Sequence, residues 1–360
     1  MNWTVEVAVA DFDILKPWAI LTNGNSDSVK YAALELAAYI EILRANFRVE
    51  QKSLPIIDSK DSSAINYIGQ SPHIVLRAKV GKGNGFTWRM DKFRLEIIGE
   101  GGRGLFNGMF DFLSALGFKW KTPDNEESPR RNSVSSHILP MRTAENRYSG
   151  QKRYLLFDNN QKKVESWIRW AARNRIDALV FPLASRAFSV FFERLTQKTG
   201  IYEIDVEAGG WELPRLVPRK YFTFHKEMFR MNEGKRDKRI NFCPTSPETI
   251  RVISSEARKV FLAHPHTKAF HLWPTRGHEQ EWCSCPSCRA FTAEEQNRIA
   301  INVAADALHE IAPSAVLSYC ELSTENSNIA LRENVIKTGR LLDSFGQETS
   351  GWFFTDLITL

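Results

Sequence analysis

Residues 269–291, AFHLWPTRGHEQEWCSCPSCRAF, decide the predicted fold, because a strand, a polar loop and the approach to a helix follow one another there. The segment opens as an apolar strand, Ala269 to Trp273, which Pro274 ends. A helix is predicted to begin after Thr292, where Thr-Ala-Glu-Glu is typical of a capping box closed by Glu295. The segment therefore predicts a βα unit with its polar loop at the carboxyl end of the strand, where barrel enzymes carry their chemistry.

Strand-like and helix-like segments alternate in the same way through the chain after residue 152. We predict strands at 153–157, 178–181, 269–273 and 315–320, one more ending near 241–243, and helices at 164–172, 187–195, from Pro247 onward, and at 293–311. Repeated βα units predict a parallel sheet covered by helices, and we favour a TIM-type β/α barrel over an open sheet. Residues 153–360 are fewer than the roughly 250 typical of a complete barrel, so we expect a barrel that is truncated at its carboxyl end.

Residues 1–125 predict a separate, small α/β domain of the sandwich type. Short strands are expected at 5–9, 18–21, 65–68, 73–76 and 93–98, and helices at 29–44 and 105–116. The glycine-rich segment 99–104 lacks the Lys-Ser/Thr of a phosphate-binding loop, so we interpret it as a tight turn between strand and helix. Residues 126–152 are rich in Pro, Ser, Asn and charge, and we expect them to form a linker.

The composition, 43% hydrophobic and 25% charged, is ordinary for a globular protein and does not favour a disordered or fibrous class. The net charge of +6 comes from no long basic block. The densest run, Gly234 to Arg239, contains an acid and predicts a solvated loop, so we expect no nucleic-acid partner.

No apolar run reaches the roughly 18 residues of a membrane-spanning helix, so we expect no membrane partner. The amino terminus, MNWTVEVAVADFDILKPW, lacks the basic start and apolar core of a signal peptide. We therefore expect a cytoplasmic location as written, or a secreted or periplasmic one if the true start lies upstream.

A set of motifs in the amino-terminal part resembles a known domain. In order they are Ala32-Ala33-x-Glu35-Leu36, Leu95-Glu-Ile-Ile-Gly99 with Arg103-Gly104, Phe112-Leu113-x-x-Leu116-Gly117-x-x-Trp120, and Pro123. On these motifs, residues 18–129 resemble the α/β domain that precedes the catalytic barrel in α-glucuronidases and β-N-acetylhexosaminidases.

A second ordered set of motifs lies in residues 203–325. Its members are Glu207-Ala-Gly-Gly210, Tyr221-Phe222, Gly234-Lys-Arg236, Phe242-Cys243, Leu272-Trp-Pro274 and Trp282-Cys-x-Cys-x-x-Cys288. They resemble the domain-of-unknown-function 4838 family of bacterial glycosidase-like proteins. The chain departs from that family at Trp211, where a histidine usually follows the paired glycines, and at Thr275-Arg276, where an aspartate often follows Trp-Pro.

The resemblance implies a glycoside hydrolase-like protein that takes part in polysaccharide degradation. The implied reaction is hydrolysis of O-glycosidic bonds in a polysaccharide or oligosaccharide, α-glucuronidase-like or hexosaminidase-like, by a carboxylate acid/base pair. The alternatives are a non-catalytic carbohydrate-binding protein of the same fold and a zinc-stabilised interaction domain. The oligomeric state stays open.

Glycoside hydrolysis needs two carboxyl groups beside the scissile bond, and three glutamates follow predicted strands. Glu321 comes directly after the strand at 315–320, while Glu279 and Glu281 follow the strand at 269–273. We predict these three as catalytic, with a solvated or salt-bridged glutamate as the alternative for each.

Sugar rings present apolar C–H faces, so sugar-binding pockets combine flat aromatic rings with polar groups at the edge. The predicted substrate-binding residues are Trp211, Trp273, His271, Arg276, Trp282 and Asp158. Arg276 has the planar fork that grips a carboxylate such as that of a uronic acid. Core packing is the alternative for the tryptophans.

Three of the five cysteines lie within six residues, which favours a metal site or reduced thiols over a disulfide framework. Cys283, Cys285 and Cys288 together with His278 supply the four soft ligands of a structural zinc ion. Reduced thiols and a local disulfide are the alternatives, and the predicted hydrolysis itself requires no cofactor. Cys243 and Cys320 are interpreted as ordinary buried cysteines near strand ends.

Overall fold

The fold is described here from a computed structural model. The described residues are 12–13, 15, 19–23, 26–49, 53–68, 71–91, 93–130, 138–139, 143–146, 151–157, 164–184, 186–274, 282–322, 327–338 and 353–359. The chain divides into two compact units. The first comprises residues 1–149, 163–177 and 197–204, and the second comprises residues 150–162, 178–196 and 205–360.

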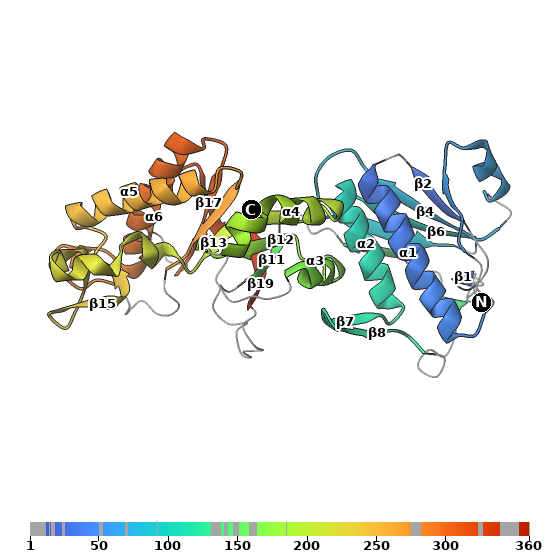
Figure 1. Ribbon diagram of the computed structural model, residues 1–360, viewed down its shortest axis with the longest axis horizontal. Coiled ribbons are helices and arrows are strands. Elements are labelled where there is room, and N and C mark those ends of the chain that lie inside the picture. The colour runs from blue at the N-terminus through green and yellow to red at the C-terminus, as the bar shows by residue number, and fades with distance from the viewer. Residues whose placement is uncertain are drawn as a thin grey trace, which may run out of the picture. The chain divides into compact units, whose positions relative to one another are not determined.

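A six-stranded sheet forms the centre of the first unit (Figure 1). Its strands, in spatial order, are β10 (Thr143–Asn146), β5 (Phe86–Met90), β6 (Arg94–Gly99), β4 (His73–Ala78), β2 (Ile20–Asn23) and β3 (Ile56–Asp58). The four strands from β6 to β3 are parallel, and β5 and β10 are antiparallel additions. The helices α1 (Asp27–Asn46) and α2 (Gly101–Ala115) lie side by side on one face of the sheet, so the expected amino-terminal α/β domain is present.

The helices of this unit begin where local chemistry favours a helix start. Ser26 caps α1, because its hydroxyl accepts a hydrogen bond from the backbone N–H of Val29 at 3.4 Å. The helix α2 starts at Gly101, inside the segment that we interpreted as a turn. A Cβ atom on Gly104 would lie 2.2 Å from the carbonyl oxygen of Gly85, so a glycine is needed there for close packing.

Some local predictions for the first unit are wrong, and one lies outside the described residues. Residues 62–66 form a 3₁₀ helix, η1 (Ser62–Asn66), where we predicted a strand at 65–68, because Asp61 accepts a hydrogen bond from Ser63 N and starts a helical turn. The strand β10 lies within the segment predicted to be a linker. The strand predicted at 5–9 lies outside the described residues, and the predicted domain limits stay a prediction.

A curled half-barrel of mostly parallel strands forms the second unit. In spatial order its strands are β18 (Val335–Thr338), β17 (Val316–Cys320), β16 (Ala269–Leu272), β13 (Asp205–Gly210), β12 (Ala178–Phe181), β11 (Gln151–Leu156) and β19 (Phe353–Thr359). From β11 to β18 the strands are parallel and adjacent in chain order, as in a TIM-type barrel, whereas β19 is antiparallel to β11. The predicted fold class is confirmed.

The helices that follow these strands largely match the predicted segments. They are α3 (Val164–Arg173), α4 (Arg186–Ile201), α5 (Pro247–Ala263) and α6 (Ala293–Ile311). The capping box of α6 is confirmed: Thr292 Oγ1 accepts from Glu295 N at 3.1 Å, and Glu295 Oε2 accepts from Thr292 N at 3.0 Å. Among the described residues, no helix is both long enough and apolar enough to cross a bilayer.

The remaining elements are short. They are the pairs β1 (Phe12–Asp13) with β9 (Ile138–Leu139), β7 (Lys119–Thr122) with β8 (Asn125–Glu127) and β14 (Phe229–Asn232) with β15 (Lys235–Phe242), and the 3₁₀ helices η2 (Leu213–Leu216), η3 (Arg219–Thr223), η4 (Lys226–Met228) and η6 (Cys288–Ala290). The strand predicted to end near 241–243 is thus β15 of a hairpin, not a strand of the barrel. We did not predict β13 or β18 as strands.

Alternation along the strands divides the half-barrel into two faces. Phe270 of β16 packs edge-to-face on Phe261 of α5 at 4.8 Å between ring centroids, so this face is covered by helix. His271, the next residue, therefore belongs to the opposite, inner face. The core on the inner face consists of Tyr154, Leu156, Ala178, Val180, Trp273 and Cys320, with Trp211 packed against it.

Candidate active site

The carboxyl ends of the parallel strands share one edge of the half-barrel, and most of the predicted site residues follow them. Trp211 lies directly after β13, Trp273 after β16 and Glu321 after β17, and these three strands are neighbours. The predicted residues Asp158, Arg276, His278, Glu279 and Glu281 lie outside the described residues. The remaining predicted residues therefore define the part of the site that the structure describes.

Glu321 lies at this edge between two cationic side chains. Its Oε1 atom accepts a hydrogen bond from Lys337 Nζ at 3.2 Å and lies 3.6 Å from Arg298 Nη2. The Glu321 side chain is 20% exposed, so the carboxylate remains accessible despite both contacts. The two ion pairs fix the position of the carboxylate at the edge, where a glycosidase places its base or nucleophile.

Glu212 is a second carboxyl group at the same edge, and we did not predict it. It lies two residues after β13 and is 8% exposed. Burial raises the pKa of Glu212 above its ordinary value, and the Arg215 guanidinium, 2.8 Å from its Oε2 atom, opposes this shift. A carboxyl group that keeps its proton at higher pH suits a general acid. Its position beside the Gly-Gly-Trp motif was the signal available in the sequence.

Glu212→Gln is expected to be more stable than the parent chain near neutral pH and to lose that advantage in acid. Because the pKa of Glu212 is raised in the folded state, its contribution to stability is complete below the unfolded pKa of about 4.3 and is lost as the pH rises through the folded pKa. The amide cannot ionise and avoids this loss. Urea unfolding at about pH 3 and about pH 7 measures the difference. An equal difference at both pH values would contradict the raised pKa.

The predicted ligand residues His271 and Trp273 are fully buried inside the half-barrel. His271 Nε2 lies 2.7 Å from Glu207 Oε2, and both residues are at most 3% exposed. Trp273 Nε1 donates to Ser318 Oγ at 3.0 Å, which fixes the ring. The His271 ring packs edge-to-face against both Tyr154 and Trp273. His271 and Trp273 therefore belong to the packed interior next to the edge rather than to its accessible surface.

The other two predicted tryptophans differ in exposure. Trp211 is half-buried and meets Trp273 at 5.4 Å between ring centroids with an interplanar angle of 70°. Trp282 is buried and packs edge-to-face on Phe242 at 5.9 Å. Trp211 is thus the predicted tryptophan that keeps surface available at the edge.

Paired glycines allow β13 and β16 to lie close together below this edge. Gly209 and Gly210 both have φ of +124°, a left-handed conformation that favours glycine. A Cβ atom on Gly209 would lie 1.9 Å from the carbonyl oxygen of His271. Gly209 is therefore required by the close approach of the backbone that carries His271, whereas Gly210 is favoured by its φ alone.

Four cysteines lie close together in the loops that follow this edge, whereas the sequence prediction grouped only three of them. Cys243, Cys283, Cys285 and Cys288 are buried, and their Sγ atoms all lie within 4.8 Å of one another. None of the four forms a disulfide. Cys243 is buried directly after a strand, as we predicted, but the sequence did not show that the chain after β15 brings Cys243 into this cluster. A set of four thiols is able to hold a soft metal ion.

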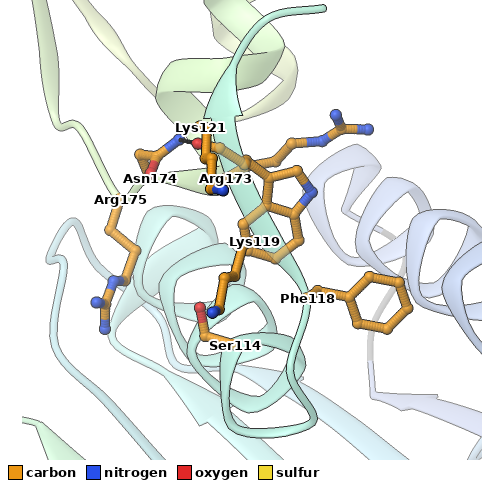
Figure 2. Close-up of a pocket in the computed structure, with 8 residues that line it drawn as sticks. Ser114, Phe118, Lys119, Lys121, Arg173, Asn174 and Arg175 are labelled. Atoms are coloured by element: carbon orange, nitrogen blue, oxygen red, sulfur yellow. Dashed lines mark hydrogen bonds between the residues drawn. The ribbon is translucent and has the colours of Figure 1, made fainter. Parts of the chain in front are cut away.

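A separate hollow of about 250 Å³ belongs to the first unit (Figure 2). Its charged lining residues are Lys119, Lys121, Arg173 and Arg175. Arg173 pairs with Glu126 at 3.0 Å and Arg175 pairs with Asp111, so part of this positive charge is already compensated. None of the predicted site residues lines the hollow, and we assign it no role.

Residues 161–338 match the family described as Domain of unknown function (DUF4838), which confirms the resemblance expected from the motifs. No curated protein sequence matches the chain.

Several solved structures resemble the fold. The β-N-acetylhexosaminidase of Streptomyces coelicolor A3(2) is 12% identical with a TM-score of 0.52, over 94% of this chain and 68% of that protein. A mutant Streptomyces plicatus β-hexosaminidase in complex with its product GlcNAc is 13% identical, with a TM-score of 0.52 and the same coverage. A Vibrio harveyi exo β-N-acetylglucosaminidase is 10% identical with a TM-score of 0.50, over 91% of this chain and 55% of that protein. At these identities the similarity shows the fold alone.

Proposed function

We propose that the chain is a glycoside hydrolase-like protein that hydrolyses O-glycosidic bonds in a polysaccharide or oligosaccharide with a pair of carboxyl groups. The observation that carries this proposal is the contrast between Glu212 and Glu321. Both follow strands at the same edge of the half-barrel, yet Glu212 is buried with a raised pKa, whereas Glu321 faces two cations. Such a contrast between two carboxyl groups is what an acid and a base or nucleophile require.

In this proposal Glu212 protonates the oxygen of the leaving sugar, and Glu321 activates water or attacks the anomeric carbon. Glu279 and Glu281 remain candidates for the second carboxylate, because their loop follows β16, which lies between β13 and β17 in the sheet. No cofactor is part of this chemistry.

The substrate is proposed to be a sugar with a polar or acidic substituent. One solved structure of similar fold is named as a β-N-acetylhexosaminidase, and another, named as a β-hexosaminidase, is in complex with its product GlcNAc. Trp211 offers the accessible ring surface for a sugar face, and the buried Trp273, which contacts His271, packs against Trp211 from the core. Arg276 and Asp158 are proposed to bind polar groups, and Arg276 suits a uronate carboxylate. α-Glucuronidase-like and hexosaminidase-like cleavage are therefore the reactions to test.

The test is hydrolysis of a panel of aryl glycosides and uronic-acid oligosaccharides, with saccharide binding measured in parallel by calorimetry. Turnover of a hexosaminide or a glucuronide supports the proposal. Binding without turnover on the whole panel would overturn it in favour of a non-catalytic carbohydrate-binding protein of the same fold. One observation favours that alternative: the ion pairs of Glu321 with Lys337 and Arg298 hold the carboxylate as a structural salt bridge would.

A further inference from the structure

The four-cysteine cluster has the dimensions of a tetrahedral metal site. Cys243 Sγ lies 3.7 Å from Cys285 Sγ and 3.6 Å from Cys288 Sγ. Zinc–sulfur bonds of about 2.3 Å in a tetrahedron place sulfur atoms about 3.8 Å apart. A disulfide instead needs sulfur atoms about 2.05 Å apart, which this cluster does not provide.

Hydrogen-bond donors surround the sulfur atoms. Met231 N donates to Cys283 Sγ at 3.2 Å, and Arg236 Nη1 lies 3.7 Å from the same sulfur. Thr245 Oγ1 lies 3.1 Å from Cys288 Sγ. A zinc ion with four thiolates carries two negative charges, which such donors and a guanidinium stabilise.

The cluster joins two long loops of the second unit, one between β13 and α5 and one between β16 and α6. Cys243 follows the hairpin β14–β15, which is inserted between β13 and α5, and a two-stranded hairpin is marginally stable by itself. The other three cysteines lie between β16 and α6, where η6 is the only regular element among the described residues. Ser284 N donates to Met231 O at 2.9 Å, so the two loops already touch beside the cluster.

We propose that Cys243, Cys283, Cys285 and Cys288 bind one structural zinc ion that clamps the β13–α5 loop to the β16–α6 loop. Four sulfur ligands close the coordination sphere, so the ion supports the fold and takes no part in catalysis. Both clamped loops leave the edge that carries Trp211 and Glu212, so the ion also holds that edge in shape. The site stands independently of the proposed hydrolysis.

The experiment measures the metal content of the full chain, purified without added metal, by plasma mass spectrometry. We expect about one zinc per chain, released by a mercurial reagent and detected with a metallochromic dye. Cys285→Ser and Cys243→Ser are expected to lose at least tenfold in zinc affinity. Cys320→Ser is the matched control, because Cys320 is equally buried but lies in the half-barrel core, and it should keep the zinc.

Exchange of the native ion for Co²⁺ gives a readout that does not depend on the variants folding. Tetrahedral thiolate coordination should produce a sulfur-to-cobalt charge-transfer band and intense visible bands. A chain that purifies without metal, with all cysteines titratable and no cobalt bands, would overturn the proposal. Iron in place of zinc, or a disulfide between any two of the four cysteines by mass spectrometry, would also overturn it.

Discussion

Gly209→Ala is expected to destabilise the second unit by about 4 kcal/mol or more, enough to leave much of the chain unfolded. The added Cβ atom would lie 1.9 Å from the carbonyl oxygen of His271, and the obstacle is backbone, which cannot rotate away. The alanine would also have to adopt a φ of +124°. β13 and β16 would have to separate, which would break the ladder between them and the contact of Glu207 with His271.

Two glycines supply matched controls for this prediction. Gly210 has the same φ, but the nearest atom to an added Cβ is Leu156 Cδ2 at 3.9 Å, so Gly210→Ala should cost only about 1–2 kcal/mol of backbone strain. Gly200 lies near the end of α4, and a Cβ atom added there would meet no neighbouring group within 4 Å. Gly200→Ala should therefore stabilise the folded chain by about 0.5–1 kcal/mol. Urea unfolding followed by circular dichroism compares the three. Equal effects at Gly209 and Gly210 would show that the close approach of β13 and β16 is absent in solution.

The sequence predicts those elements whose pattern is local, such as α6 and β12, and misses β13, whose glycines depend on a distant strand. The helix α6 has a capping box and a continuous helical pattern, and the structure begins it where predicted. The strand β12 is a short apolar run with both faces buried, and its limits also agree. We did not predict β13, because it contains Glu207 and two glycines, which are unusual in a strand. The contacts that explain them are made with β16, about sixty residues later.

The candidate site shows the same limit at the level of single residues. Cys283, Cys285 and Cys288 are visible as a group because they are neighbours in sequence, whereas Cys243 joins them only through the folded hairpin. The position of Glu212 beside the Gly-Gly-Trp motif is visible in the sequence, but its burial, which raises its pKa, is a property of the folded chain. Position after a predicted strand does place Glu321 at the carboxyl edge of the sheet, since parallel strands end on a common edge, while its catalytic role stays a prediction.

Glu321→Gln and Glu212→Gln are each expected to reduce turnover by about 10²–10⁴-fold on a natural glycoside while sugar affinity is retained. Glutamine keeps the size of the side chain but neither donates a carboxyl proton nor attacks as a carboxylate. The exposed Glu310, whose side chain is 54% exposed and pairs with Arg258 on the helical layer, offers a control, and Glu310→Gln should leave turnover unchanged.

Substrates with different leaving groups and the pH dependence of kcat/KM distinguish the general acid from the base or nucleophile. An aryl glycoside with an acidic leaving group needs no general acid, so Glu212→Gln should recover most of its rate on that substrate, whereas Glu321→Gln should stay slow on both. In the parent chain kcat/KM should fall as the pH rises through the raised pKa of Glu212, because the acid must be protonated, and Glu212→Gln should lack that alkaline fall. If the parent chain is active and its turnover survives both substitutions, Glu212 and Glu321 are not the catalytic pair. The chemistry would then be assigned to Glu279 and Glu281. Rescue of Glu321→Gln by the acidic leaving group would reverse the two roles.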